Sequence, residues 1–134
     1  MTAASQALIV DDDKSIRFVL REALKQNGWT VAEIDDGSLV EEELERRRYD
    51  LLLLDLYMPG MNGFEVLRRI RRPLAGTVTV RKTPPTVGII VLSGAAGREG
   101  LEFATRLGAD ACLPKPFEVA DVLAAVREIT RSAR

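Results

Sequence analysis

Side chains able to bind a metal ion and a phosphoryl group stand at the ends of short apolar runs or between prolines. They are Asp11, Asp12, Asp55, Ser93 and Lys115. The aspartates follow the apolar residues 7–10 and 51–54, the serine follows residues 88–92, and the lysine has a proline on each side. If these runs are strands of one parallel sheet, their carboxyl ends share an edge, and we expect the side chains to meet there.

Three carboxylates at one edge repel each other, so at least one takes up a proton unless a cation lies close. A divalent cation and the Lys115 ammonium would let all of them stay ionised. Mg²⁺ prefers oxygen ligands in near-octahedral geometry and keeps several waters. An ionised aspartate is also a nucleophile that forms an aspartyl phosphate. In such a transfer the metal, Lys115 and Ser93 each take one oxygen of the phosphoryl group.

Hydrophobic periodicity places these residues on an alternation of strands and helices. We predict strands at 7–10, 30–34, 51–54, 87–92 and 111–113, and helices at about 14–27, 38–47, 64–70, 98–107 and 119–129. Such an alternation predicts an α/β fold, a doubly wound five-stranded parallel sheet with five helices. The flavodoxin-like strand order 2-1-3-4-5 is the obvious candidate, and its switch point between strands 1 and 3 is where ligands bind.

Smaller features of the chain are also predicted. Asp13 caps the first helix, and Ser38-x-x-Glu41 resembles a capping box for the second. Residues 73–86 contain prolines and a glycine, so we expect a long loop, with room for a short β excursion at 77–80.

The composition fits an ordinary soluble protein with one domain. The 134 residues are 46% hydrophobic and 29% charged, with a net charge of −1, which argues against a dedicated nucleic-acid or membrane-surface binder. The absence of histidine excludes histidine-based catalysis. One cysteine, Cys112, allows no internal disulfide and suits a reducing cytosol. The start lacks a signal peptide and the apolar runs are too short to cross a bilayer, so we expect a cytoplasmic protein.

Four motifs jointly resemble the response-regulator receiver domain of two-component signalling systems. They occur in the family's order and at near-family spacing: residues 9–13 (IVDDD), 54–63 (LDLYMPGMNG), 92–94 (LSG) and 113–117 (LPKPF). The resemblance covers about residues 6–130, and we expect 1–134 to be a single receiver domain.

The resemblance implies a role for each residue of the metal site. Asp12 binds Mg²⁺ directly, and Asp11 does so directly or through water. Asp55, the phosphoacceptor, is also a metal ligand. Tyr57 contributes its backbone carbonyl.

The remaining motif residues handle the phosphoryl group. Ser93 swings toward it as part of the switch, and Lys115 pairs with it. The Lys115–Pro116 peptide bond is expected to be cis, a form that is far less costly before proline than elsewhere.

The resemblance also implies a phosphorelay function. A sensor histidine kinase, a phosphotransfer protein or a small acyl phosphate phosphorylates Asp55 in the presence of Mg²⁺. The modified form shifts an equilibrium at a distal partner-binding face. The domain promotes its own phosphorylation and dephosphorylation but is not an enzyme that turns over a free substrate. The downstream effector is not specified, and we expect neither membrane nor nucleic-acid binding by this domain alone.

Two other functions use the same residues. An aspartate-nucleophile phosphohydrolase usually needs a second acid two residues after the nucleophile, where this chain has Tyr57. A phosphate-independent interaction module could also be built on a receiver scaffold. Equal partner binding by the wild type and Asp55→Asn would favour that module.

Three features set this chain apart: a residue that departs from the family's usual pattern, a bulky residue beside the site and a span that contains no acid. The family usually has Tyr or Phe three residues before the lysine, where this chain has Cys112, and we expect a small packed residue there. Tyr57 is bulky enough to shade the phosphoryl group and lengthen its lifetime. Finally, the span 66–98 contains no acid, and we expect a solvated basic face, with docking to an acidic partner or nucleic acid as the alternative. Its basic residues are Arg68, Arg69, Arg71, Arg72, Arg81, Lys82 and Arg98.

Overall fold

The computed structural model describes residues 5–58, 60–74, 81–94 and 97–132, in which strands and helices alternate. The strands are β1 (Ser5–Val10), β2 (Trp29–Ile34), β3 (Leu51–Asp55), β4 (Gly88–Ser93) and β5 (Ala111–Pro114). The helices are α1 (Lys14–Gln26), η1 (Gly37–Leu39), α2 (Val40–Arg46), α3 (Gly63–Arg71), α4 (Gly97–Arg106) and α5 (Val119–Ser132). The predicted elements are confirmed, with boundaries that shift by up to three residues.

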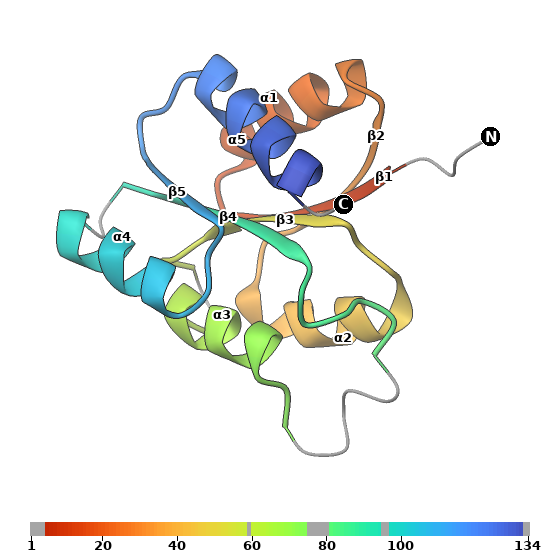
Figure 1. The fold of residues 1–134 in the computed structure, drawn as a ribbon, viewed down its shortest axis with the longest axis vertical. Coiled ribbons are helices and arrows are strands. Elements are labelled where there is room, and N and C mark those ends of the chain that lie inside the picture. Colours follow the sequence, from red (N-terminus) through yellow and green to blue (C-terminus); the bar gives the residue numbers. More distant parts are fainter. Residues whose placement is uncertain (1–4, 59, 75–80, 95–96, 133–134) are drawn as a thin grey trace.

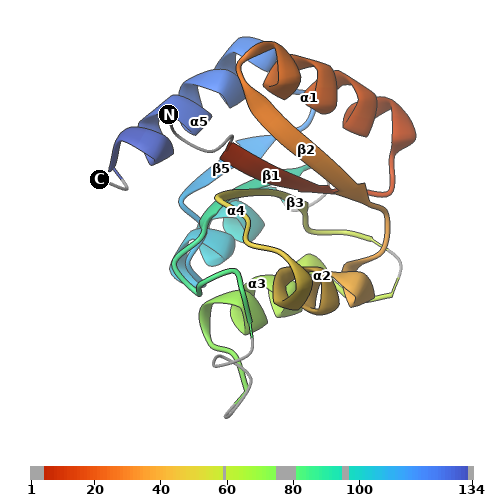
Figure 2. The same ribbon diagram turned by 90° about the vertical axis from the view of Figure 1, so that its right-hand side faces the viewer.

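The strands form one sheet in the order β2-β1-β3-β4-β5. Every neighbouring pair is parallel, and the register sets Val10 beside Leu54 and Ser93 beside Pro114. Figure 1 shows α1 and α5 on one face of the sheet and α2, α3 and α4 on the other, and Figure 2 shows the same layers from the side. The predicted doubly wound α/β fold with strand order 2-1-3-4-5 is therefore confirmed.

The central strand β3 explains why the sheet needs helices on both faces. All of its residues are buried, and successive side chains point to opposite faces. Leu52 and Leu54 pack with α2, α3 and α4 in one core cluster, whereas Leu51 and Leu53 pack with α1 and α5 in the other. A fully buried leucine contributes about 1.5–3 kcal/mol relative to an exposed one, so both layers are held to the sheet by this strand.

The start of the second helix differs from the predicted capping box. Asp36 is the capping residue, and its Oδ1 accepts hydrogen bonds from both the backbone N–H and the hydroxyl of Ser38 at 2.8 Å. A 3-10 turn, η1, follows, and α2 begins without a side-chain cap. The Ser38–Glu41 capping box is therefore wrong, because the nearer carboxylate of Asp36 engages the serine hydroxyl.

Two arginines of the basic span are structural rather than solvated. Arg71 donates to the carbonyl oxygens of Gly108, Pro85 and Val87 at 2.9, 2.7 and 2.6 Å. Arg81 donates to the carbonyl oxygens of Thr83 at 2.9 Å, Ile70 at 2.9 Å and Arg69 at 3.4 Å. For these two residues, both the solvated-face and the docking interpretations are wrong. Their donors are engaged by carbonyl oxygens of α3, of the segment between α3 and β4, and of the turn after α4. The predicted excursion at 77–80 lies outside the described residues.

Candidate functional site

Three carboxylates gather at the carboxyl edge of the sheet, where β1 and β3 end side by side. Asp11 and Asp12 follow β1, and Asp55 is the last residue of β3. One oxygen from each lies within 4.8 Å of the others. Asp13 takes no part in this group, because its carboxylate caps α1 by accepting from the backbone N–H of Ser15 at 2.9 Å, as predicted.

Asp11 is buried and strongly held. Its Oδ1 accepts the backbone N–H of Asp13 at 2.8 Å, and its Oδ2 accepts from Lys115 Nζ at 2.8 Å. A buried carboxylate without a partner would be costly. The ammonium and the N–H therefore compensate for its removal from water and fix its direction.

Asp55 is nearly as deeply buried but less fully compensated. Its Oδ1 accepts the backbone N–H of Tyr57 at 3.2 Å, and its Oδ2 lies 3.4 Å from Lys115 Nζ. Burial raises the pKa of the Asp55 carboxyl above its ordinary value, and the Tyr57 N–H and the Lys115 ammonium offset only part of that effect. A further cation beside Asp55 would favour the ionised, nucleophilic form.

Lys115 is the cation shared by the buried aspartates. Burial lowers the pKa of its ammonium, but the carboxylates of Asp11 and Asp55 outweigh that effect, so the pKa is raised overall. Its backbone N–H donates to the Ser93 carbonyl oxygen at 2.9 Å, which joins β5 to the end of β4. The Lys115–Pro116 bond is cis, as expected.

Ser93 ends β4 at the same edge of the sheet and is buried. The structure therefore places the aspartates, the serine and the lysine of the predicted site at one edge. Unlike the buried Asp11, Asp55 and Ser93, Asp12 is exposed. A ligand can therefore reach its carboxylate from solvent.

The donor set fits a divalent cation. The cluster has three carboxylates and one ammonium, that of Lys115, which contacts Asp11 and Asp55. It therefore carries excess negative charge that a doubly charged ion would neutralise. Hard oxygen donors of this kind suit Mg²⁺ rather than metals that favour sulfur or nitrogen ligands. Asp11, Asp12 and Asp55 are thus able to hold Mg²⁺.

The loop after Asp55 is fixed by a close approach of α3. The N–H of Gly63 donates to the Leu56 carbonyl oxygen at 2.6 Å. A Cβ at Gly63 would lie 2.3 Å from the Leu56 Cα, a distance that no side chain tolerates. Glycine is therefore required for α3 to begin so close to the strand that supplies Asp55.

On β5, Cys112 stands where the resemblance to receiver domains implies an aromatic residue, and its thiol is packed against α4. The Cys112 sulfur lies 3.4 Å from the Thr105 hydroxyl on α4, and burial raises the pKa of the thiol. A raised pKa disfavours the reactive thiolate. Cys112 is thus a small packed residue, as predicted.

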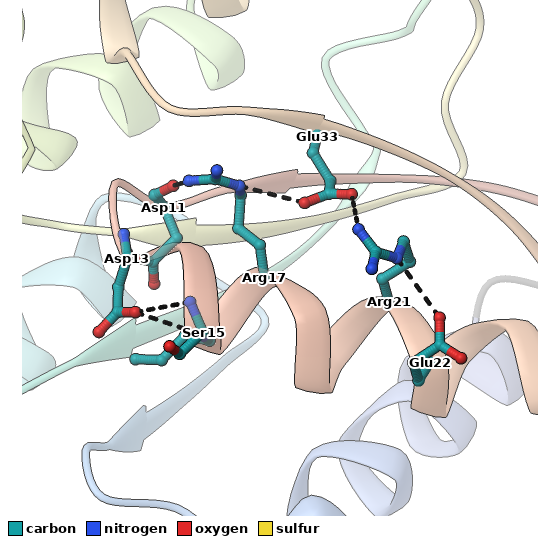
Figure 3. A network of polar contacts seen from close by, with 8 residues as sticks. Asp11, Asp13, Ser15, Arg17, Arg21, Glu22 and Glu33 are labelled. Carbon is teal, nitrogen blue, oxygen red and sulfur yellow. Dashed lines mark hydrogen bonds and ion pairs between the residues drawn. The ribbon is translucent and has the colours of Figure 1, made fainter.

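Arg17 and Glu33 are contacts of the site that the sequence reasoning missed. Arg17 on α1 donates to the Asp11 carbonyl oxygen at 2.6 Å and to Glu33 Oε1 on β2 at 3.1 Å. Arg21, one turn later, donates to Glu33 Oε2 at 2.6 Å (Figure 3). The available signal was an acid within a half-buried strand and two arginines four residues apart on the preceding element of the chain.

Comparison with known proteins agrees with this arrangement. Residues 7–127 match the family described as "Response regulator receiver domain". Response regulator MprA of Mycobacterium leprae is 35% identical over 127 residues, which are 95% of this chain and 51% of that protein. Transcriptional regulatory protein TctD of Salmonella typhimurium is 35% identical over 125 residues, 92% of this chain and 51% of its own.

A solved structure supports the same family. The response regulator receiver domain protein (CheY-like) from Methanospirillum hungatei has a TM-score of 0.78 and 28% identity, over 94% of this chain and 93% of that one. The chain belongs to the receiver-domain family of two-component response regulators. These matches do not favour a phosphohydrolase or a phosphate-independent module.

The chain spans about half the length of the curated relatives named above. Within the part of the chain that the structure describes, no helix is both long enough and apolar enough to cross a lipid bilayer.

Proposed function

We propose that Asp55 is the phosphoacceptor of a Mg²⁺-dependent phosphorelay switch. The observation that carries this proposal is that carboxylate oxygens of Asp11, Asp12 and Asp55 lie within 4.8 Å of one another. Two of these residues, Asp11 and Asp55, share the Lys115 ammonium. Response regulators receive phosphoryl groups from histidine kinases, and the family match supports a donor of that class for this chain.

Each residue has a distinct part in the proposed transfer. Asp11, Asp12 and Asp55, with the backbone carbonyl of Tyr57, would hold Mg²⁺, which supplies charge neutralisation at the phosphoryl oxygens. An ionised Oδ of Asp55 attacks phosphorus in line with the leaving group. As the new P–O bond forms, the P–N bond of a phosphohistidine donor breaks and the imidazole leaves. With an acyl phosphate donor, the P–O bond to the acyl group breaks and the carboxylate leaves. Lys115 binds a second phosphoryl oxygen.

Ser93 completes the set. Its hydroxyl would turn toward a third oxygen of the phosphoryl group. Ser93 is the last residue of β4, and α4 begins shortly afterwards at Gly97. A movement of Ser93 would therefore be passed on to α4, and so to a face of the domain that is distant from the phosphorylation site.

The test of this proposal is mass spectrometry after incubation with acetyl phosphate, with and without Mg²⁺. We expect an adduct of one phosphate in the wild type with metal, and none after metal removal. The matched control is Asp55→Asn, which keeps the shape of the side chain and removes the nucleophile. Failure to label with any donor, or equal labelling of Asp55→Asn, would contradict the proposal.

The remaining assignments follow from this role. We take residues 6–130 as one receiver unit, supported by the family match over 7–127. A sensor histidine kinase or a phosphotransfer protein is the proposed donor, and an effector that reads the distal face is the proposed output. The unit works in the cytoplasm and does not turn over a free substrate.

Tyr57 is expected to lengthen the life of the phosphoaspartate. Tyr57 stands two residues beyond Asp55 and is 47% exposed. Its ring meets the Phe64 ring edge-on, with centroids 6.2 Å apart. Replacing it by alanine should open a path for water and speed dephosphorylation by about tenfold, or about 1.4 kcal/mol of barrier. The measurement is the decay of labelled protein. Tyr57→Phe, which keeps the ring, should decay like the wild type, and an unchanged rate in Tyr57→Ala would show that the ring gives no shelter.

A further inference from the structure

Arg17 joins the main chain of Asp11 to the neighbouring strand β2. Its Nη1 donates to the Asp11 carbonyl oxygen at 2.6 Å, and its Nε donates to Glu33 Oε1 at 3.1 Å. The side chain is only 14% exposed, so packing restricts it further. In Figure 3 the guanidinium lies between Asp11 and Glu33 and touches both.

The bond from Arg17 acts at a different point from the other contacts of Asp11. The Asp13 N–H and Lys115 Nζ each hold a carboxylate oxygen of Asp11 at 2.8 Å. The Arg17 bond holds the carbonyl of the peptide that links Asp11 to Asp12. Rotation of that peptide would move both carboxylates, and these belong to the cluster that fits a cation.

We propose that Arg17 is a positioning residue for the metal site. By fixing the peptide between Asp11 and Asp12, it holds their carboxylates in place before the cation arrives. Partners of this kind, one bond removed from the metal ligands, are known to set metal affinity by orienting those ligands. The inference rests on the proposed function, because it takes the acidic cluster as the Mg²⁺ site.

Simple electrostatics predicts the opposite result. Arg17 is a cation near the acidic cluster, so removing its charge alone would tighten the binding of a divalent cation. Loss of positioning would weaken that binding. The sign of the change in affinity therefore separates the two effects.

Arg21 provides a matched control within the same network. It donates to the other oxygen of Glu33 at 2.6 Å, and its other hydrogen bond in the described residues goes to Glu22 at 3.4 Å. Arg17→Met and Arg21→Met each remove one cation and one ion pair with Glu33. Only Arg17→Met removes a bond to Asp11.

The experiment measures the affinity of the whole chain for Mn²⁺, as a substitute for Mg²⁺, from the EPR signal of free Mn²⁺. We expect the dissociation constant of Arg17→Met to rise about 10- to 100-fold, while that of Arg21→Met stays close to wild type. Thermal unfolding in EDTA should show that both variants fold, with the larger loss of stability in Arg17→Met, which also gives up the bond to the Asp11 carbonyl. If Arg17→Met does not fold, Arg17→Lys against Arg21→Lys is judged by the same criterion.

Two results would overturn the inference. Unchanged or tighter Mn²⁺ binding in Arg17→Met would show that no positioning is lost. Equal weakening in both variants would show a general loss of the network. Failure of the wild type to bind Mn²⁺ at all would instead contradict the proposed metal site, so the two proposals fail in distinguishable ways.

Discussion

Lys115→Met is expected to be phosphorylated by acetyl phosphate about 10²- to 10³-fold more slowly than the wild type. The ammonium lies 2.8 Å from Asp11 and 3.4 Å from Asp55, so it sits where negative charge develops on the transferred group. Removing one such preorganised group commonly costs about 3–4 kcal/mol of transition-state stabilisation. The measurement is the initial rate of labelling at saturating Mg²⁺.

The same substitution should destabilise the fold when no metal is present. Methionine leaves the buried Asp11 carboxylate without its cation, and such a loss costs about 3 kcal/mol. Urea unfolding in EDTA would measure it. Because a cation that binds only the folded chain stabilises it, added Mg²⁺ should recover part of the loss.

Lys14→Met is the matched control, because Lys14 is an exposed lysine at the start of α1, next to the same acidic segment. It should label at close to the wild-type rate and lose about 0.5 kcal/mol or less. If Lys115→Met labelled as fast as Lys14→Met, Lys115 would have no part in the transfer.

Arg71→Met is expected to lower the free energy of unfolding by about 3 kcal/mol. Its guanidinium donates to carbonyl oxygens from two loops and lies 2.9 Å from Asp110 Oδ2. Methionine has a similar stem but no donors. A buried acceptor left without a partner costs about 1–3 kcal/mol, and water that reaches the partly exposed Gly108 and Pro85 recovers part of that sum. Urea unfolding checks the result.

The neighbouring Arg72 supplies the control. It is exposed and belongs to the same basic span, so Arg72→Met should change stability by about 0.5 kcal/mol or less. Arg71→Lys should also be destabilised, because one ammonium does not reproduce the flat fork of donors. Equal stability of the Arg71 and Arg72 variants would show that the loops do not need the guanidinium.

Much of the site could be predicted because its residues stand at strand ends. Asp55 closes a run of leucines, and the edge of a parallel sheet collects such positions whatever their distance along the chain. The start of the second helix was harder. Ser38 and Asp36 both have the chemistry of a cap, and only the observed backbone shows that the Asp36 carboxylate binds the serine.

The sequence by itself determined the order of the elements, the burial of the sheet on both of its faces and the kind of chemistry at its edge. These depend on hydrophobic period and on residue types at strand ends, which are local properties of the chain. Only the tertiary structure decided where the arginines go. Arg17, Arg71 and Arg81 have long side chains with many rotamers, so their partners depend on which distant carbonyls the packing brings within reach. Nothing in their immediate neighbours distinguishes them from the exposed Arg72.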